Sequence, residues 1–93
     1  MTLSEIERLA LLVEECAEVQ QVVGKILRHG YESTNPTIRN SVTNRTLLES
    51  ELGDVSYAIN LMIKAKDVTL SAIETAQDEK ELRVGQYLHY NEV

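Results

Sequence analysis

The chain has 93 residues, enough for one domain spanning residues 1–93 and too few for a separate substrate or regulatory domain. Fifteen acidic against nine basic residues give a net charge of −6, which argues against nucleic acid as a partner because phosphate contacts need basic patches. Phe and Trp are absent, so the core must be aliphatic. A chain this short buries only about 60–65% of its unfolded surface, so self-association would help to complete that core.

The sequence carries no sign of secretion or of membrane insertion. Its only cysteine, Cys16, cannot form an internal disulfide, and no Cys/His spacing suits zinc. The first residues include an acid where a signal peptide has basic residues, and no apolar stretch approaches the roughly 20 residues of a membrane span. We therefore expect a cytoplasmic protein with no membrane partner, and we expect Cys16 to pack in the core.

The first predicted helix begins at the N-terminus and ends near Gly30. Thr2 with Glu5, or Ser4 with Glu7, has the spacing of a capping box. Apolar residues then follow a 3.6-residue period without interruption, until bases in the last turn precede a glycine. That combination is a typical C-terminal signal.

A polar segment and two further helices follow. Residues 31–44 are rich in Ser, Thr and Asn and hold the only proline, which predicts a loop, with a helical turn from Pro36 as an option. Helical periodicity returns over residues 45–66 and again over 69–85, whereas the tail 86–93 has no clear assignment. No alternating strand pattern occurs. The sequence predicts an all-α fold with two long helices and one or two shorter ones.

Acidic residues occupy unexpected positions on both long helices. When the first helix is drawn at about 100° per residue, Glu15 and Glu18 fall among the apolar core positions. In the second long helix, Glu51 and Asp54 likewise fall inside the apolar arc, whereas Glu49 lies on the polar side. Since residues three apart share a helix face, each helix directs one pair of carboxylates toward its packing face.

Four ionised carboxylates cannot stay unpaired in an apolar interface, because burial costs on the order of several kcal/mol per ion. Basic partners are scarce, since only Arg8 and Lys66 share these faces, about two turns or more from the acids. Protonation is a second solution, and divalent cations between the helices are a third. We favour Mg²⁺ or Mn²⁺, because both prefer oxygen ligands. A di-iron bundle would need Glu-x-x-His motifs, which the sequence lacks.

The two acidic pairs have a counterpart in a known family. The runs EECAEV at 14–19 and ELGDV at 51–55 resemble the paired ExxE and ExxD motifs of the MazG-like all-α nucleoside triphosphate pyrophosphohydrolases. The resemblance covers the two long helices, and the two motifs together are more specific than either alone. One departure is the 32-residue connection between Glu18 and Glu51, longer than in many members of the family. Another is the absence, around Asp54, of the Asp-hydrophobic-hydrophobic-Tyr-His run typical of the phosphoribosyl-ATP branch.

The resemblance implies Mg²⁺-dependent cleavage of a nucleoside triphosphate between its α and β phosphates, which yields the monophosphate and pyrophosphate. It implies that the metal ligands are Glu15, Glu18, Glu51 and Asp54. It also implies a homodimer or homotetramer of helical bundles, which agrees with the broad apolar arcs on both long helices. The long loop at 31–44 would then shape the pocket for the base.

Further polar residues are candidates for the chemistry. Glu14, at the edge of the acidic sector, is a candidate general base. Five side chains are candidates for contacts with the substrate: Lys25, Arg28, Asn60, Lys80 and Arg83. For all six, a solvated surface position is the competing interpretation.

Two classes of function remain open on these grounds. The first is a nucleoside triphosphate pyrophosphohydrolase, an enzyme. The second is a non-catalytic helical oligomer that binds protein and uses the acids as a structural cation site. The first is favoured, because an interaction helix has no reason to place acids in its own interface.

Overall fold

The computed structural model describes residues 1–90, and every regular element within that range is helical. Three α-helices and one 3₁₀ turn follow one another along the chain: α1 (Leu3–His29), α2 (Asn44–Lys64), α3 (Leu70–Val84) and η1 (Gly85–Tyr87). The prediction of an all-α fold with two long helices and a shorter one is confirmed. Residues 91–93 of the unassigned tail lie outside the described range. No helix in residues 1–90 is both long and apolar enough to cross a bilayer.

Threonine caps begin all three α-helices. The hydroxyl oxygen of Thr2 accepts a hydrogen bond from the Glu5 N–H at 3.1 Å, and a Glu5 carboxylate oxygen accepts one from the Thr2 N–H at 2.7 Å. This is the first of the two capping boxes considered from the sequence, and it satisfies two donors that a helix start leaves free. Thr43 and Thr69 cap α2 and α3 with one hydrogen bond each.

The end of α2 lies at Lys64, two residues before the predicted position. Lys66 has a left-handed backbone with a φ of 65°, and the Asp67 N–H donates to the Met62 carbonyl at 2.9 Å. This hydrogen bond belongs to a Schellman ending, in which glycine is the usual residue at the left-handed position. A lysine at that position does not mark a helix end in the sequence as a glycine does, so the predicted helix was two residues too long.

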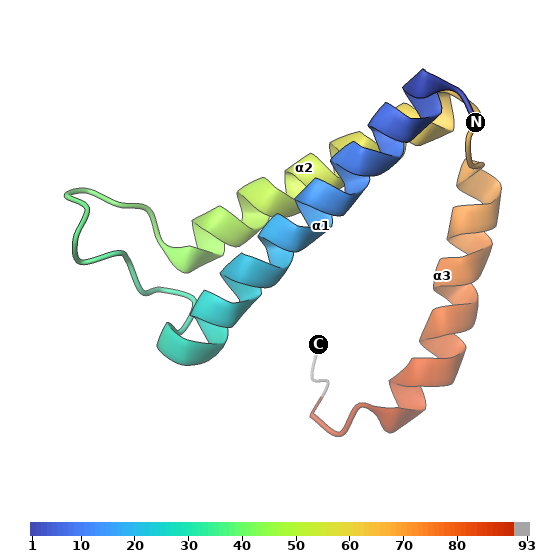
Figure 1. Ribbon diagram of the computed structural model, residues 1–93. Helices are drawn as coiled ribbons and strands as arrows, with labels where there is room; N and C mark the ends of the chain where they lie inside the picture. The colour runs from blue at the N-terminus through green and yellow to red at the C-terminus, as the bar shows by residue number, and fades with distance from the viewer. Residues whose placement is uncertain (91–93) are drawn as a thin grey trace.

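α1 and α2 lie side by side as an antiparallel hairpin (Figure 1). Val22, Ala58 and Met62 are the buried apolar residues of the hairpin, so its core is small and aliphatic. At the end remote from the loop, the Arg8 guanidinium donates to both carboxylate oxygens of Asp67 at 2.6 and 3.0 Å. This bidentate pair ties the start of α1 to the end of α2.

The loop between α1 and α2 is closed at its base. The Asn44 N–H donates to the Ser33 carbonyl at 2.9 Å, and the Arg45 N–H donates to the Tyr31 carbonyl at 2.8 Å. The Asn44 side chain is buried, and its amide group donates to the Gly30 carbonyl at 3.1 Å. Because these bonds pair backbone groups on both sides of the loop, they hold its two ends together.

The option of a helical turn from Pro36 is wrong. Residues 35–38 form a turn, in which the Ile38 N–H donates to the Asn35 carbonyl at 3.2 Å, and a second turn over 38–41 follows, but neither extends into a helix. The side-chain oxygen of Asn35 accepts from the N–H and from the hydroxyl of Thr37, at 2.9 and 2.7 Å. A short polar side chain that bonds to nearby backbone in this way competes with helix formation.

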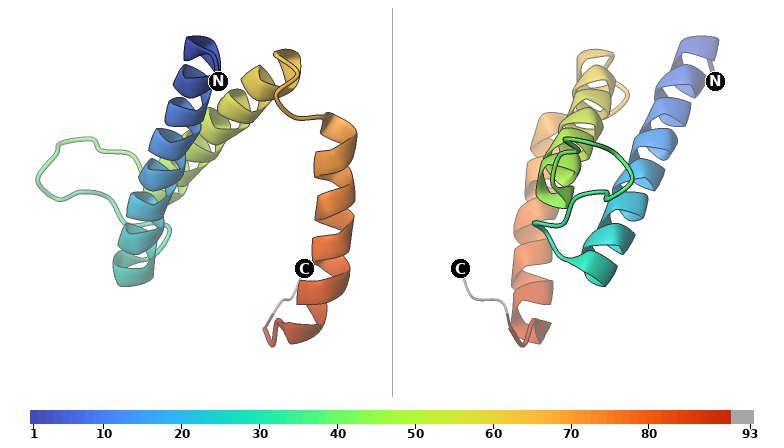
Figure 2. Two further views of the ribbon diagram at one scale, coloured as in Figure 1. Left: turned by 45° about the vertical axis from the view of Figure 1, so that its right-hand side comes forward. Right: turned by 90° about the vertical axis from the view of Figure 1, so that its left-hand side faces the viewer.

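α3 leaves the hairpin at the end opposite to the loop and stands apart from it, running directly into η1 (Figures 1 and 2). The radius of gyration is 16.4 Å, whereas about 12 Å is expected for a compact chain of this length. Leu27 of α1 and Leu82 of α3 are 82% and 80% exposed. Cys16 is also exposed, which corrects the expectation that it packs in the core. A single chain therefore leaves much apolar surface without cover.

Gly53 lies inside α2, where glycine costs about 0.5–1 kcal/mol relative to alanine. Outside its own helix backbone and chain neighbours, no atom of residues 1–90 lies within 4 Å of the position that a Cβ would take there. We expect Gly53→Ala to raise the free energy of unfolding by about 0.5–1 kcal/mol in denaturant titrations. Gly24→Ala in α1 is the control, because its Cβ would meet the Arg28 guanidinium at an ordinary 3.6 Å. A loss of stability in Gly53→Ala alone would contradict the prediction and indicate a neighbouring subunit against Gly53.

Candidate metal centre

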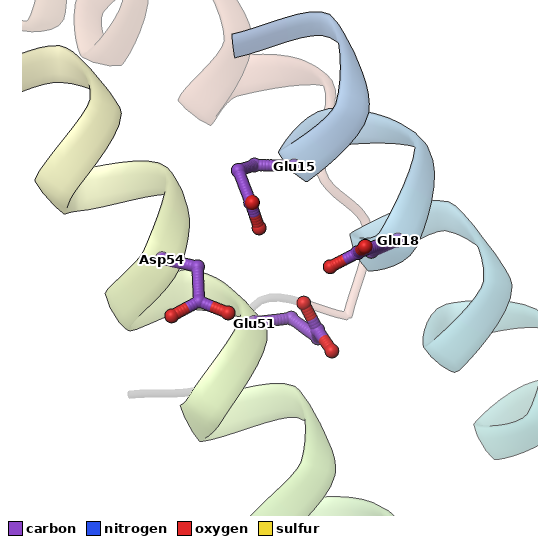
Figure 3. Close-up of side chains that lie close together, drawn as sticks. All are labelled: Glu15, Glu18, Glu51 and Asp54. Atoms are coloured by element: carbon purple, nitrogen blue, oxygen red, sulfur yellow. The ribbon is translucent and has the colours of Figure 1, made fainter. Parts of the chain in front are cut away.

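Four carboxylates meet between the two helices of the hairpin (Figure 3). Glu15 and Glu18 come from α1, and Glu51 and Asp54 come from α2. The spacing of three residues places both members of a pair on one face, and the antiparallel packing turns the two faces toward each other. One oxygen from each side chain lies within 4.8 Å of the corresponding oxygens of the other three. The structure thus brings together all four residues that the helical wheel singled out; we call them the carboxylate cluster.

The carboxylate cluster lies at the boundary between the hairpin interface and solvent. Glu15, Glu18 and Glu51 are half-buried, and Asp54 is exposed. The Oε2 atoms of Glu15 and Glu51 are shielded from solvent, and neither has a hydrogen-bond partner among residues 1–90. Shielded carboxylate oxygens normally have partners, so two unpaired acceptors in one cluster call for a cation or a proton.

No basic side chain neutralises the carboxylate cluster within the described part of the chain. The ion pairs found there are Arg8–Asp67 and Arg45–Glu32, and neither includes a residue of the cluster. Arg8 is one of the two bases that share a face with the acids in the sequence pattern. It is instead held by Asp67 at the far end of the hairpin.

Two acids of the cluster, Glu15 and Glu51, lie where their ionised form is disfavoured. Burial raises the pKa of Glu15 above its ordinary value, and the charges of Glu18 and Asp54 raise it further. The pKa of Glu51 is raised first by the adjacent carboxyl group of Glu18, with which a protonated Glu51 would share its proton, and then by burial. A divalent cation between the helices would remove this repulsion and stabilise the ionised form.

The donor set fits a hard divalent cation. The four ligand groups are carboxylates, without the nitrogen or sulfur ligands that zinc favours. Oxygen sets of this kind, completed by water, suit Mg²⁺ and Mn²⁺. The Oε2 atoms of Glu15 and Glu51 accept no hydrogen bond from the described residues, so their lone pairs are not already used by a protein donor.

Of the other candidate residues on the hairpin, Glu14 lies next to the carboxylate cluster, and Lys25, Arg28 and Asn60 lie further along the helices. Glu14 is exposed and close enough for its charge to contribute to the raised pKa of Glu15. Lys25 and Arg28 lie on the last turns of α1 and line a cavity beside the loop. Asn60 is exposed, six residues beyond Asp54 on α2.

The basic pair predicted on the third helix is not brought to the carboxylate cluster within one chain. Lys80 and Arg83 lie on α3, beside a shallow hollow that Ile73, Ala76 and Gln77 also line. α3 stands apart from the hairpin, so these two side chains are remote from the four acids (Figure 1). Both residues are exposed, as the competing surface interpretation requires.

A cavity of about 860 Å³ lies between the loop and the adjoining ends of α1 and α2; we call it the loop cavity. The loop was expected to shape a base pocket, but the individual wall residues were not identified from the sequence. The wall residues that no sequence pattern had indicated individually are His29, Ser33, Thr34, Asn35, Pro36, Ile38, Ser41, Val42, Asn44 and Leu47. Their Ser/Thr/Asn-rich composition was the available signal. Composition does not reveal the hydrogen bonds that close the loop at its base.

The hairpin therefore combines an acidic site with a neighbouring cavity that carries basic side chains. The acidic site attracts an anionic ligand only after cations have offset its charge.

No protein-family model, curated protein or solved structure matches the chain.

Proposed function

We propose that the carboxylate cluster is the divalent-cation site of a hydrolase that cleaves phosphoric anhydrides. The observation that carries the proposal is the approach of four carboxylate oxygens within 4.8 Å of one another, with two shielded oxygens that have no partner among residues 1–90. A structural network of ion pairs would have included a base, and the described residues supply none there. Acids held at such a cost in a helix interface are typical of a functional site.

Within that class, the proposed reaction is that of a MazG-like nucleoside triphosphate pyrophosphohydrolase, because the ExxE and ExxD pairs resemble the motifs of that family. A ribo- or deoxyribonucleoside triphosphate would be cleaved between its α and β phosphates to the monophosphate and pyrophosphate. Both the substrate and the chain, with its net charge of −6, are anionic. Cations at the carboxylate cluster are therefore needed to bring the phosphates close to the four acids.

Glu15, Glu18, Glu51 and Asp54 would hold Mg²⁺, or Mn²⁺ in its place. When bound, the ion supplies neutralising charge for the phosphates and lowers the pKa of water near the α phosphorus. The side chains fix where that positive charge sits, because each helix presents its pair at a rigid spacing of three residues. Glu14, exposed beside the cluster, is the candidate base that accepts the proton of the attacking water.

The direct test is pyrophosphate release from a panel of NTPs and dNTPs, measured with Mg²⁺ and with EDTA. We expect at least one nucleotide to be cleaved, and only when the metal is present. No release from any nucleotide would overturn the proposal. That result would favour a non-catalytic helical oligomer with a structural cation site. The exposed apolar side chains on all three helices support this alternative.

We also propose that the chain functions as a homodimer or homotetramer of helical bundles. Leu3, Val13 and Leu27 of α1 are 86%, 70% and 82% exposed, and α3 has little contact with the hairpin. A second subunit that buried these faces would complete the core that one chain lacks. Light scattering at micromolar concentration should give a mass at least twice that of the 93-residue chain. A monomeric mass would contradict this prediction.

A further inference from the structure

The loop cavity and the carboxylate cluster are neighbours along the same hairpin. Leu47 in the cavity wall precedes Glu51 by four residues, a rise of about 6 Å along α2. On α1, Lys25 follows Glu18 by seven residues, two turns along the same side of the helix. The cavity volume of about 860 Å³ is typical of small-molecule sites. The near wall of the cavity therefore lies about one helical turn from the cluster along α2.

Basic side chains line the α1 side of the loop cavity. Lys25, Arg28 and His29 all contribute to this wall. Lys25 and Arg28 take part in neither ion pair of residues 1–90. In a chain with a net charge of −6, two basic side chains without an ion-pair partner beside one cavity favour an anionic group on the ligand.

The loop side of the cavity adds apolar and hydrogen-bonding groups. Ile38 and Val42 line it and are 58% and 50% exposed, although both are aliphatic. Exposed aliphatic side chains around a cavity favour a ligand with an apolar face. The Asn35 amide nitrogen, which donates to no other residue of the described chain, is available to a polar edge of that ligand.

Hydrogen bonds hold this wall in place before any ligand arrives. The Asn35 N–H donates to the Ser41 hydroxyl at 2.9 Å, and that hydroxyl donates back to the Asn35 carbonyl at 3.2 Å. Asn44 is 6% exposed and bonds to the Gly30 carbonyl at 3.1 Å, which closes the loop at its base. A preformed wall lowers the entropic cost of binding.

We infer that the loop cavity binds the nucleoside part of a nucleotide, so that the loop determines which base is accepted. A phosphate ion would contact the basic side chains Lys25 and Arg28 and leave the aliphatic wall unoccupied. An apolar ligand would leave those two side chains without an anionic partner. A nucleotide has a flat apolar base with hydrogen-bonding edges and a phosphate next to its sugar. The orientation rests on the proposed function, which has the metal and the remaining phosphates at the carboxylate cluster.

The test uses nucleoside 5′-monophosphates as probes, by calorimetry in EDTA, so that no metal links the ligand to the carboxylate cluster. At least one of the common ribo- or deoxyribonucleotides should bind to the parent protein. Ribose 5-phosphate has the same phosphate and no base, and it should bind at least about tenfold more weakly. Thr34→Trp, which fills the cavity from its wall, should weaken binding at least about tenfold, whereas Arg39→Trp, on the same loop outside the wall, should change it less than about twofold.

Circular dichroism establishes that each variant keeps its helices, and Val42→Glu is a second wall variant should Thr34→Trp fail to fold. Equal binding of ribose 5-phosphate, or unchanged nucleotide binding in the folded wall variants, would overturn the inference, as would a parent that binds no monophosphate. Pyrophosphate release is measured separately on the parent. Monophosphate binding that the wall variants lose supports the inference even if no triphosphate is cleaved. Cleavage without such binding supports the proposed function and refutes the role of the cavity.

Discussion

Glu51→Gln and Asp54→Asn are each expected to slow pyrophosphate release at least about a hundredfold, about 2.7 kcal/mol of transition-state stabilisation. Each substitution removes one negative charge from the carboxylate cluster while nearly preserving the shape of the side chain. Three carboxylates and a neutral amide bind a divalent cation less tightly than four carboxylates, so both the affinity for Mg²⁺ and the turnover should fall. Initial rates measured across a range of Mg²⁺ concentrations separate these two effects.

Glu49→Gln is the matched control, because it removes the same charge from an exposed position on the same helix. It should change neither activity nor stability appreciably. Without metal, Glu51→Gln and Asp54→Asn should be at least as stable as the parent, because each relieves repulsion among the acids. Acids held instead by buried hydrogen-bond or ion-pair partners would lose stability on neutralisation. Full activity in all three variants, or damage from Glu49→Gln alone, would refute the metal-site interpretation.

Millimolar Mg²⁺ or Mn²⁺ is expected to raise the melting temperature of the protein near neutral pH. An ion that binds only the folded state adds about 1.4 kcal/mol at ten times its Kd, which corresponds to several degrees for a domain of this size. The effect should shrink as the pH falls toward the raised pKa values of Glu15 and Glu51, because protons compete with the metal for the same carboxylates. Differential scanning calorimetry at matched ionic strength measures both trends.

Without metal, the stability of the protein should increase on mild acidification, whereas the stabilisation by Mg²⁺ decreases. The pKa values of Glu15 and Glu51 are raised in the folded state, so these groups bind protons more readily there than in the unfolded chain. Their contribution to stability is therefore full below the ordinary value of 4.5 and is lost as the pH rises through the raised pKa values. Glu5 and Asp67 have lowered pKa values, so their stabilising effect is lost only at more acidic pH. A melting temperature that neither rises on mild acidification nor responds to Mg²⁺ would contradict the repulsion within the cluster.

The features that the sequence predicted correctly depend on local periodicity. The spacing of three residues brings Glu15 and Glu18 to one helix face and Glu51 and Asp54 to another. A single antiparallel contact between the two helices then suffices to gather all four. The start of α1 could also be predicted, because the capping box of Thr2 and Glu5 lies within one helical turn.

Features that depend on a single backbone conformation, or on contacts between distant residues, were beyond the sequence. The end of α2 depends on a left-handed Lys66, and the closure of the loop depends on a hydrogen bond between Asn44 and Gly30, which are 14 residues apart. The exposed Cys16 illustrates another limit. A helical wheel assigns a residue to an apolar arc, but the width of arc that is covered depends on the number of partner helices.

The hydrogen bonds at the base of the loop have a consequence for how such a hairpin diversifies. Because Asn44 and Arg45 bond back to Gly30, Tyr31 and Ser33, the helices enter and leave the loop in a fixed register. Insertions or substitutions between residues 34 and 43 therefore alter the cavity wall without shifting the two acidic pairs relative to each other. The hairpin acts as a constant frame and the loop as an exchangeable module, so that ligand choice can change independently of the cation site.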